Sequence, residues 1–73
     1  MLLEVTMSPR RLATVLKEMR LEKGMTQIDL AKRAKVTRSY VALLETGEKQ
    51  NPSLTILKRL ATALGVPVSD LLQ

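Results

Sequence analysis

The chain has 73 residues, of which 45% are hydrophobic and 26% are charged, and this composition predicts one small globular domain rather than a disordered tail. It contains no cysteine and no histidine, which excludes disulfides, thiolate chemistry, the commonest metal ligand and the usual general base near neutral pH. We therefore expect a protein that is not an enzyme and that needs no cofactor.

The first predicted helix follows a short N-terminal segment. Residues 1–8 are expected to form a leader or an arm, and the folded domain is expected to span residues 9–73. Ser8 and Pro9 predict a helix N-terminus, because serine caps a helix and proline suits its first position. Apolar residues then recur at helical spacing, at Leu12, Val15, Leu16 and Met19. Gly24 can take the left-handed conformation that ends a helix, so this helix is predicted at about 9–23.

A second, shorter helix is predicted at about 27–34. Thr26 and Asp29 have the spacing of a capping box, in which each side chain bonds the other residue's backbone N–H group. The apolar face of this helix is expected to consist of Ile28, Leu30, Ala31 and Ala34.

A third helix is predicted at about 38–45, capped by Thr37 and ended by Gly47, with Val41 and Leu44 facing inward. Helices this short are unstable alone, so neighbouring helices must hold them. Because only two or three residues join the second and third helices, they must cross steeply, as in a helix-turn-helix. Such a unit leaves the outer face of its second helix free to enter a DNA major groove.

The last part of the chain predicts a fourth helix and a final helical turn. Ser53 follows Pro52 as a cap, and Gly65 ends the helix. The apolar residues of the fourth helix are Leu54, Leu57, Leu60, Ala61 and Leu64. Ser69 is expected to cap the final turn, which carries Leu71 and Leu72. No segment alternates with period two, so the predicted fold is all-α.

The basic residues are concentrated in one half of the chain. Twelve Lys and Arg against seven Asp and Glu give a net charge of +5. Residues 10–38 carry nine of these cations and three of the acids, whereas cations and acids balance in residues 39–73. A one-sided basic region is typical of a surface that binds a polyanion. It also fits a surface that only keeps the protein in solution, so charge alone leaves both interpretations open.

Six short motifs occur in a fixed order, namely Gly24-Met25-Thr26-Gln27, Leu30-Ala31, Val36-Thr37-Arg38-Ser39, Glu45-Thr46-Gly47, Asn51-Pro52-Ser53-Leu54 and Ala63-Leu64-Gly65-Val66. Together they make the chain, from about Leu12 to Leu72, resemble the Cro and phage-repressor (Xre-like) helix-turn-helix family. Residues 37–41 are also similar to the controller proteins of restriction–modification systems. The resemblance implies a compact five-helix domain that binds double-stranded DNA in transcription regulation, commonly as a homodimer on a palindromic site.

The resemblance also implies which residues contact DNA. It places Gln27 at a phosphate-contacting position and Thr37, Arg38 and Ser39 at the start of the recognition helix. Arg38 is the best candidate for reading a base, because its guanidinium can pair with O6 and N7 of guanine. Lys49 lies in a loop that runs along the phosphate backbone in relatives. The expected DNA contacts are Gln27, Lys35, Thr37, Arg38, Ser39, Tyr40, Leu43 and Lys49.

Three of these positions leave alternatives open. Tyr40 either points outward to a thymine methyl or a phosphate, or folds back onto the edge of the core. Leu43 stands where relatives often carry a polar base reader, so it either contacts thymine methyls or packs within the domain or against a partner. Lys35 replaces the family's usual glycine, at about 1 kcal/mol of strain if the left-handed backbone is kept. Its charge either contacts a phosphate or lies in solvent.

Two further sets of residues are expected to serve structure and assembly. The resemblance implies that Arg20 and Glu45 form an ion pair that braces the motif and does not touch DNA. Four large apolar residues near the C-terminus exceed what closing the core needs. We expect them to form a dimer interface, comprising Val66, Val68, Leu71 and Leu72.

The sequence therefore predicts a sequence-specific, double-stranded-DNA-binding transcriptional regulator that binds a palindromic operator as a homodimer. RNA polymerase is a further candidate partner. The alternative is a protein-interaction module on the same fold, such as an antitoxin or a polymerase adaptor. The chain has neither a signal-peptide pattern nor an apolar run long enough to span a membrane, which predicts a cytoplasmic protein without a membrane partner.

Overall fold

The computed structural model describes residues 9–72, which form four α-helices and one short 3-10 helix and contain no strand. Helix α1 spans Pro9–Glu22, α2 spans Gln27–Ala34, α3 spans Arg38–Thr46, α4 spans Leu54–Leu64, and the 3-10 helix η1 spans Val68–Leu71. The predicted all-α class is confirmed. The fifth element is a 3-10 turn instead of a fifth α-helix.

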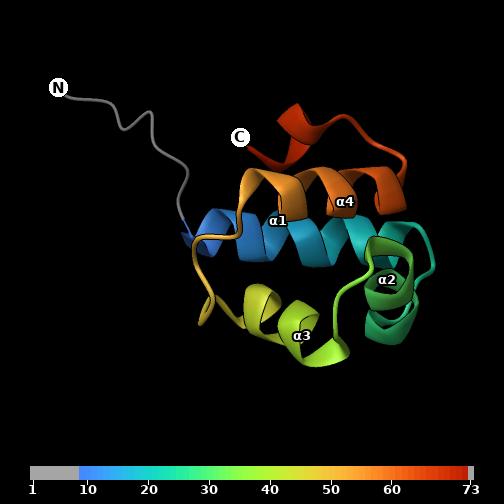
Figure 1. Ribbon diagram of the computed structural model, residues 1–73, viewed down its shortest axis with the longest axis horizontal. Helices are drawn as coiled ribbons and strands as arrows, with labels where there is room; N and C mark the ends of the chain where they lie inside the picture. The colour runs from blue at the N-terminus through green and yellow to red at the C-terminus, as the bar shows by residue number, and fades with distance from the viewer. Residues whose placement is uncertain (1–8, 73) are drawn as a thin grey trace, which may run out of the picture.

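Helix α2 is packed between α3 and α4. Helix α2 packs against both α3 and α4, while α3 also packs on α1, and η1 covers α4. In Figure 1, α3 lies on one side of α1, and η1 lies on the opposite side of the domain from α3. No helix within residues 9–72 has the length and apolar character that crossing a bilayer requires. The arrangement leaves the outer surfaces of α3 and α4 uncovered by other helices.

The helix boundaries agree closely with the predicted caps. Helix α1 begins at Pro9 and ends one residue before its predicted end, and Gly24 has a φ of 70°. In the capping box of α2, the Thr26 hydroxyl accepts the Asp29 N–H at 3.0 Å, and the Asp29 carboxylate accepts the Thr26 N–H at 3.0 Å. Ser53 caps α4 by accepting the Ile56 N–H at 3.2 Å. The predicted leader at residues 1–8 lies outside the described residues.

One apolar core joins all five elements. Its fully buried large side chains are Leu12, Leu16, Leu30, Val41, Leu44, Leu60, Leu64 and Leu71. Ile28 is not part of it, because its side chain is 50% exposed. The prediction that Ile28 belongs to the buried face of α2 is therefore wrong. It precedes Leu30 by two residues, which at 3.6 residues per turn turns it well away from the face that Leu30, Ala31 and Ala34 share.

The final turn also differs from its prediction. It begins at Val68 after Pro67, with no side-chain cap, so Ser69 lies inside the turn and does not precede it. Its backbone bonds span three residues, from the Asp70 N–H to the Pro67 carbonyl at 3.0 Å and from the Leu72 N–H to the Ser69 carbonyl at 3.1 Å. A segment of four residues is too short for a series of α-helical bonds, and the tighter 3-10 turn satisfies its backbone instead.

The capping box of α2 makes stability depend on pH. The pKa of Asp29 lies below its usual value, chiefly because its carboxylate accepts a hydrogen bond from the Thr26 backbone N–H. A lowered carboxylate pKa in the folded state gives stability that is present above the unfolded pKa and is lost as the pH falls through the folded pKa.

We expect Asp29→Ala to lower the melting temperature at about pH 7, with the deficit shrinking toward about pH 2 as the wild-type carboxylate is protonated. Thermal unfolding followed by circular dichroism measures both values. Glu18→Ala removes an exposed carboxylate from the middle of α1 and is the matched control. If Asp29→Ala lowers the melting temperature equally at both pH values, the ionised carboxylate of Asp29 is not what stabilises the capping box.

Candidate nucleic-acid interface

The outer face of α3 is open to a partner. Val41 and Leu44 face the core, so the residues on the other side of the helix point outward. Arg38 and Ser39, the first two residues of α3, are both exposed, and Leu43 is exposed one turn further along. This face therefore presents a cation, a hydroxyl and an apolar side chain in succession.

Thr37 fixes the N-terminus of α3. Its hydroxyl oxygen accepts the Tyr40 N–H at 3.0 Å, which uses an acceptor site and leaves the hydroxyl hydrogen available to donate. The N-terminal end of a helix carries a partial positive charge, and Arg38 adds a full charge to it. The start of α3 is therefore the part of this face best suited to an anion.

Tyr40 and Lys49 lie together beside α3. The Tyr40 ring is half-buried and packs against the core, which is the second of its two predicted alternatives. The Lys49 ammonium lies 5.6 Å from the ring centroid, within the range of a cation–π contact. The Lys49 N–H also donates to the Leu43 carbonyl at 3.1 Å, so the loop after α3 folds back along the helix. Beside it lies a hollow of about 400 Å³ lined by Leu43, Glu48, Lys49, Gln50 and Asn51.

Arg20 and Glu45 connect α1 to the end of α3. Arg20 Nε donates to Glu45 Oε2 at 2.6 Å and Nη2 donates to Oε1 at 3.1 Å, while Nη1 donates to the Met25 carbonyl at 2.7 Å. Arg20 is 7% exposed, and its hydrogen bonds with Glu45 raise its pKa, so the guanidinium remains charged despite burial. The structure thus gives both residues a bracing role.

Gln27 also bonds to Glu45, a contact that the sequence did not reveal. Its Nε2 donates to Glu45 Oε1 at 3.1 Å. A primary amide nitrogen carries two hydrogens, so one N–H remains for another acceptor. The half-buried Gln27 side chain at the start of α2 is therefore held toward the end of α3.

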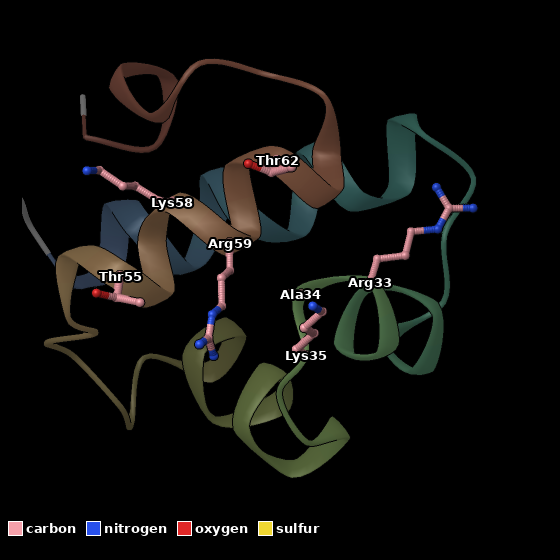
Figure 2. Close-up of a pocket in the computed structure, with 7 residues that line it drawn as sticks. All are labelled: Arg33, Ala34, Lys35, Thr55, Lys58, Arg59 and Thr62. Atoms are coloured by element: carbon pink, nitrogen blue, oxygen red, sulfur yellow. The ribbon is translucent and has the colours of Figure 1, made fainter.

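Lys35 keeps the left-handed backbone of the position where the family usually has glycine, with φ 61° and ψ 44°. Its side chain lines a groove between the end of α2 and the outer surface of α4 (Figure 2). The structure thus separates Lys35 from the outer face of α3, although only three residues lie between Lys35 and Ser39.

The predicted dimer residues differ in what they offer a partner. Leu71 is 1% exposed and belongs to the core of its own chain, so it offers almost no surface for contact with a second copy. Val66 and Val68 are half-buried against the same core. Leu72 is 43% exposed. Leu54, which was not among the predicted dimer residues, is also exposed.

Comparison with known proteins identifies the family. A model described as helix-turn-helix matches residues 16–71. The chain belongs to this helix-turn-helix family. The immunity repressor protein of Bacillus phage phi105 is 44% identical over 54 residues, which cover 74% of this chain and 37% of the repressor. The chain thus spans little more than a third of that repressor's length. Other matching relatives are also named as transcriptional regulators and not as enzymes.

Two solved structures extend the likeness to controller proteins of restriction–modification systems. C.AhdI from Aeromonas hydrophila has a TM-score of 0.83 and 36% identity, covering 86% of this chain and 94% of that one. Wild-type C.Esp1396I has a TM-score of 0.76 and 34% identity, covering 81% of this chain and 75% of that one. Further structures of C.Esp1396I carry single replacements of an arginine, a threonine or a tyrosine at three successive positions.

The buried ion pair predicts that each single replacement lowers stability strongly and that the two losses do not add. Arg20→Met leaves the Glu45 carboxylate without its main partner, and Glu45→Met strands the buried guanidinium. Each replacement is expected to lower the free energy of unfolding by about 3–5 kcal/mol. The double replacement Arg20→Met with Glu45→Met is expected to lose much less than the sum, because neither charge is left unpaired.

Urea unfolding followed by circular dichroism measures these free energies. Glu48→Met, which removes an exposed carboxylate three residues from Glu45, is the control and is expected to change stability little. Additive losses in the double variant would show that the two side chains act independently.

Proposed function

We propose that this protein is a sequence-specific transcriptional regulator that inserts α3 into the major groove of double-stranded DNA. The observation that carries the proposal is the exposed outer face of α3, which starts with Arg38 at the positive end of the helix. The family and the regulatory role of the relatives support the same function.

Each proposed contact follows from the chemistry of its side chain. Arg38 pairs with guanine in the groove, and Leu43 packs on a thymine methyl, because leucine has no group that hydrogen-bonds a base. The remaining N–H of Gln27 and the hydroxyl of Thr37 donate to phosphates, and Lys49 neutralises a third phosphate. We include as further contacts Ser39, the exposed part of the half-buried Tyr40, and Lys35, which would reach a phosphate from beside the outer face of α3.

The start of α3 resembles a run of three residues that have been replaced one at a time in structures of a relative. C.Esp1396I has been solved with replacements in a run of arginine, threonine and tyrosine. Arg38, Ser39 and Tyr40 form the matching run in this chain, with serine in place of threonine. Serine keeps the hydroxyl, so this run offers the same donors and acceptors.

Arg38→Ala tests the assignment of the base reader. The variant is expected to bind its own operator about 1–3 kcal/mol more weakly and to discriminate less at the guanine position. The operator comes from selection of bound duplexes from a random pool, and fluorescence anisotropy with matched and mismatched duplexes measures both quantities.

The matched control is Lys49→Ala, which removes a proposed phosphate contact. It is expected to weaken binding to all duplexes equally and to reduce the slope of log affinity against log salt by about 0.9. If Arg38→Ala binds its operator as tightly and as selectively as the wild type, Arg38 does not read a base.

We also propose that the protein acts as a homodimer on a palindromic operator in the cytoplasm, with RNA polymerase as a further candidate partner. A single small domain reads few base pairs, and a second copy doubles the site. The C-terminal segment supports this proposal, because Leu72 is 43% exposed and Val66 and Val68 are only half-buried. Exposed Leu54 on the adjoining α4 adds apolar area.

Leu72→Glu is expected to dissociate the homodimer, because it places a charge in the proposed apolar contact. Light scattering at micromolar concentration, with and without a palindromic duplex, measures the molar mass. Leu21→Glu is the matched control, since Leu21 is 57% exposed at the end of α1, outside the proposed contact. A wild-type protein that stays monomeric on the palindrome would contradict the proposal.

A further inference from the structure

A second basic surface lies in the groove between the end of α2 and the outer side of α4. The groove has a volume of about 400 Å³ and is open to solvent. Its polar lining is contributed by Arg33, Lys35, Thr55, Lys58, Arg59 and Thr62. In Figure 2 the four cationic side chains do not converge on one point, since Lys58 and Arg33 point to opposite sides of the view and Arg59 and Lys35 lie between them. This distribution suits an extended anion better than a single phosphate.

The outer surface of α4 carries two cations and no acidic residue because of its sequence. Thr55, Lys58, Arg59 and Thr62 recur at helical spacing and so form one stripe on the side opposite the buried leucines. Helix α4 contains no Asp or Glu, so no carboxylate one turn away can pair with these cations. The lining of the groove within the described residues has no acidic side chain either.

The positive charge of the groove is therefore largely uncompensated. None of its four cations has an ion-pair partner within residues 9–72. Asp29, at the opposite end of α2, is affected by the charge of Arg33, but this is a small part of the lowering of its pKa. Four cations that border one hollow without a counter-charge create a local field that attracts polyanions.

Lys35 ends α2 in the left-handed conformation with which Gly47 and Gly65 end α3 and α4, so a cation stands at a backbone position that favours glycine. Lys35 is the only residue other than glycine with a positive φ in the described part of the chain. This conformation costs about 1 kcal/mol for a residue with a Cβ atom, and such strain is commonly found at functional sites. Glycine would relieve the strain but would remove a cation from the groove.

The groove and the outer face of α3 belong to different surfaces. Helix α3 packs on α1 and α2, whereas α4 packs on α2 and η1. Their outer faces point away from the core that they share, and Figure 1 shows α3 and η1 on opposite sides of the domain, with α4 beside η1. Apart from Lys35, none of the residues that line the groove is a proposed DNA contact, so DNA on the outer face of α3 leaves the other three cations of the groove to another molecule.

We propose that this groove docks an acidic segment of a partner protein while α3 holds DNA. The inference rests on the proposed function only in assigning DNA to α3. An acidic segment matches the groove in charge and in extent, and the two threonine hydroxyls supply donors to its carboxylates. The chain thus binds a second macromolecule on a surface that shares only Lys35 with the proposed DNA contacts.

The test uses the full chain saturated with its selected operator duplex and a fluorescein-labelled oligoglutamate peptide as the probe. The wild-type complex is expected to bind the peptide, and Lys58→Glu with Arg59→Glu is expected to weaken this binding by about tenfold or more. The matched control is Lys17→Glu with Lys23→Glu, which makes the same change of charge on exposed residues near α1 and is expected to retain peptide binding. Lys35 stays unchanged, because it also belongs to the proposed DNA contacts.

Two results would overturn the docking proposal. In one, the groove variant binds the peptide as well as the α1 control does. In the other, operator DNA displaces the peptide while the groove variant loses duplex affinity and salt dependence, which would assign the groove to the DNA backbone. Circular dichroism verifies that each variant is folded. The neutral variant Lys58→Gln with Arg59→Gln must also lose affinity for the peptide, but less than the glutamate variant does. If no duplex binds at all, the proposed function fails, and peptide titration of the free protein still tests the groove.

Discussion

The carboxylate of Glu45 holds the helix-turn-helix unit in place. Its Oε2 accepts a hydrogen bond from Arg20, and its Oε1 accepts one from Arg20 and one from Gln27. Arg20 also binds the Met25 carbonyl in the connection between α1 and α2. One buried charge pair thus fixes the end of α3 relative to α1, to the start of α2 and to the loop between them. Because the pair is shielded from water, its geometry is more strongly enforced than that of a surface ion pair.

This bracing matters because α2 and α3 are too short to be stable alone. They have eight and nine residues, below the length at which an isolated helix forms in water. The side chains of Thr26 and Thr37 each satisfy one free N–H group at the start of these helices, and the core holds their inner faces. The position of Arg38 is therefore set by tertiary structure, which gives the side chain a defined place from which to meet a base.

Much of the fold could be predicted from local chemistry. Caps, prolines and glycines act within a few residues, so the boundaries of α2 and α4 were predicted correctly. The exposure of Ile28 and the burial of Leu71 were harder to predict, because both depend on how neighbouring elements surround these residues. The bond between Gln27 and Glu45 joins residues eighteen positions apart, and no local pattern indicates it. The family resemblance pointed to the Arg20–Glu45 pair, but not to the contacts that Arg20 and Glu45 make beyond it.

The groove shows why charge counted along the sequence can hide charge in space. Cations and acids balance in residues 39–73, yet Lys58 and Arg59 lie on α4 while Glu45 bonds to Arg20, away from the groove. Folding separates charges that the count cancels. Helix α2 then connects the two basic surfaces, since Gln27 at its start bonds to the end of α3 and Arg33 near its end borders α4. The two surfaces are therefore built on the two ends of one short helix, and the packing of α2 against both α3 and α4 fixes their relative position.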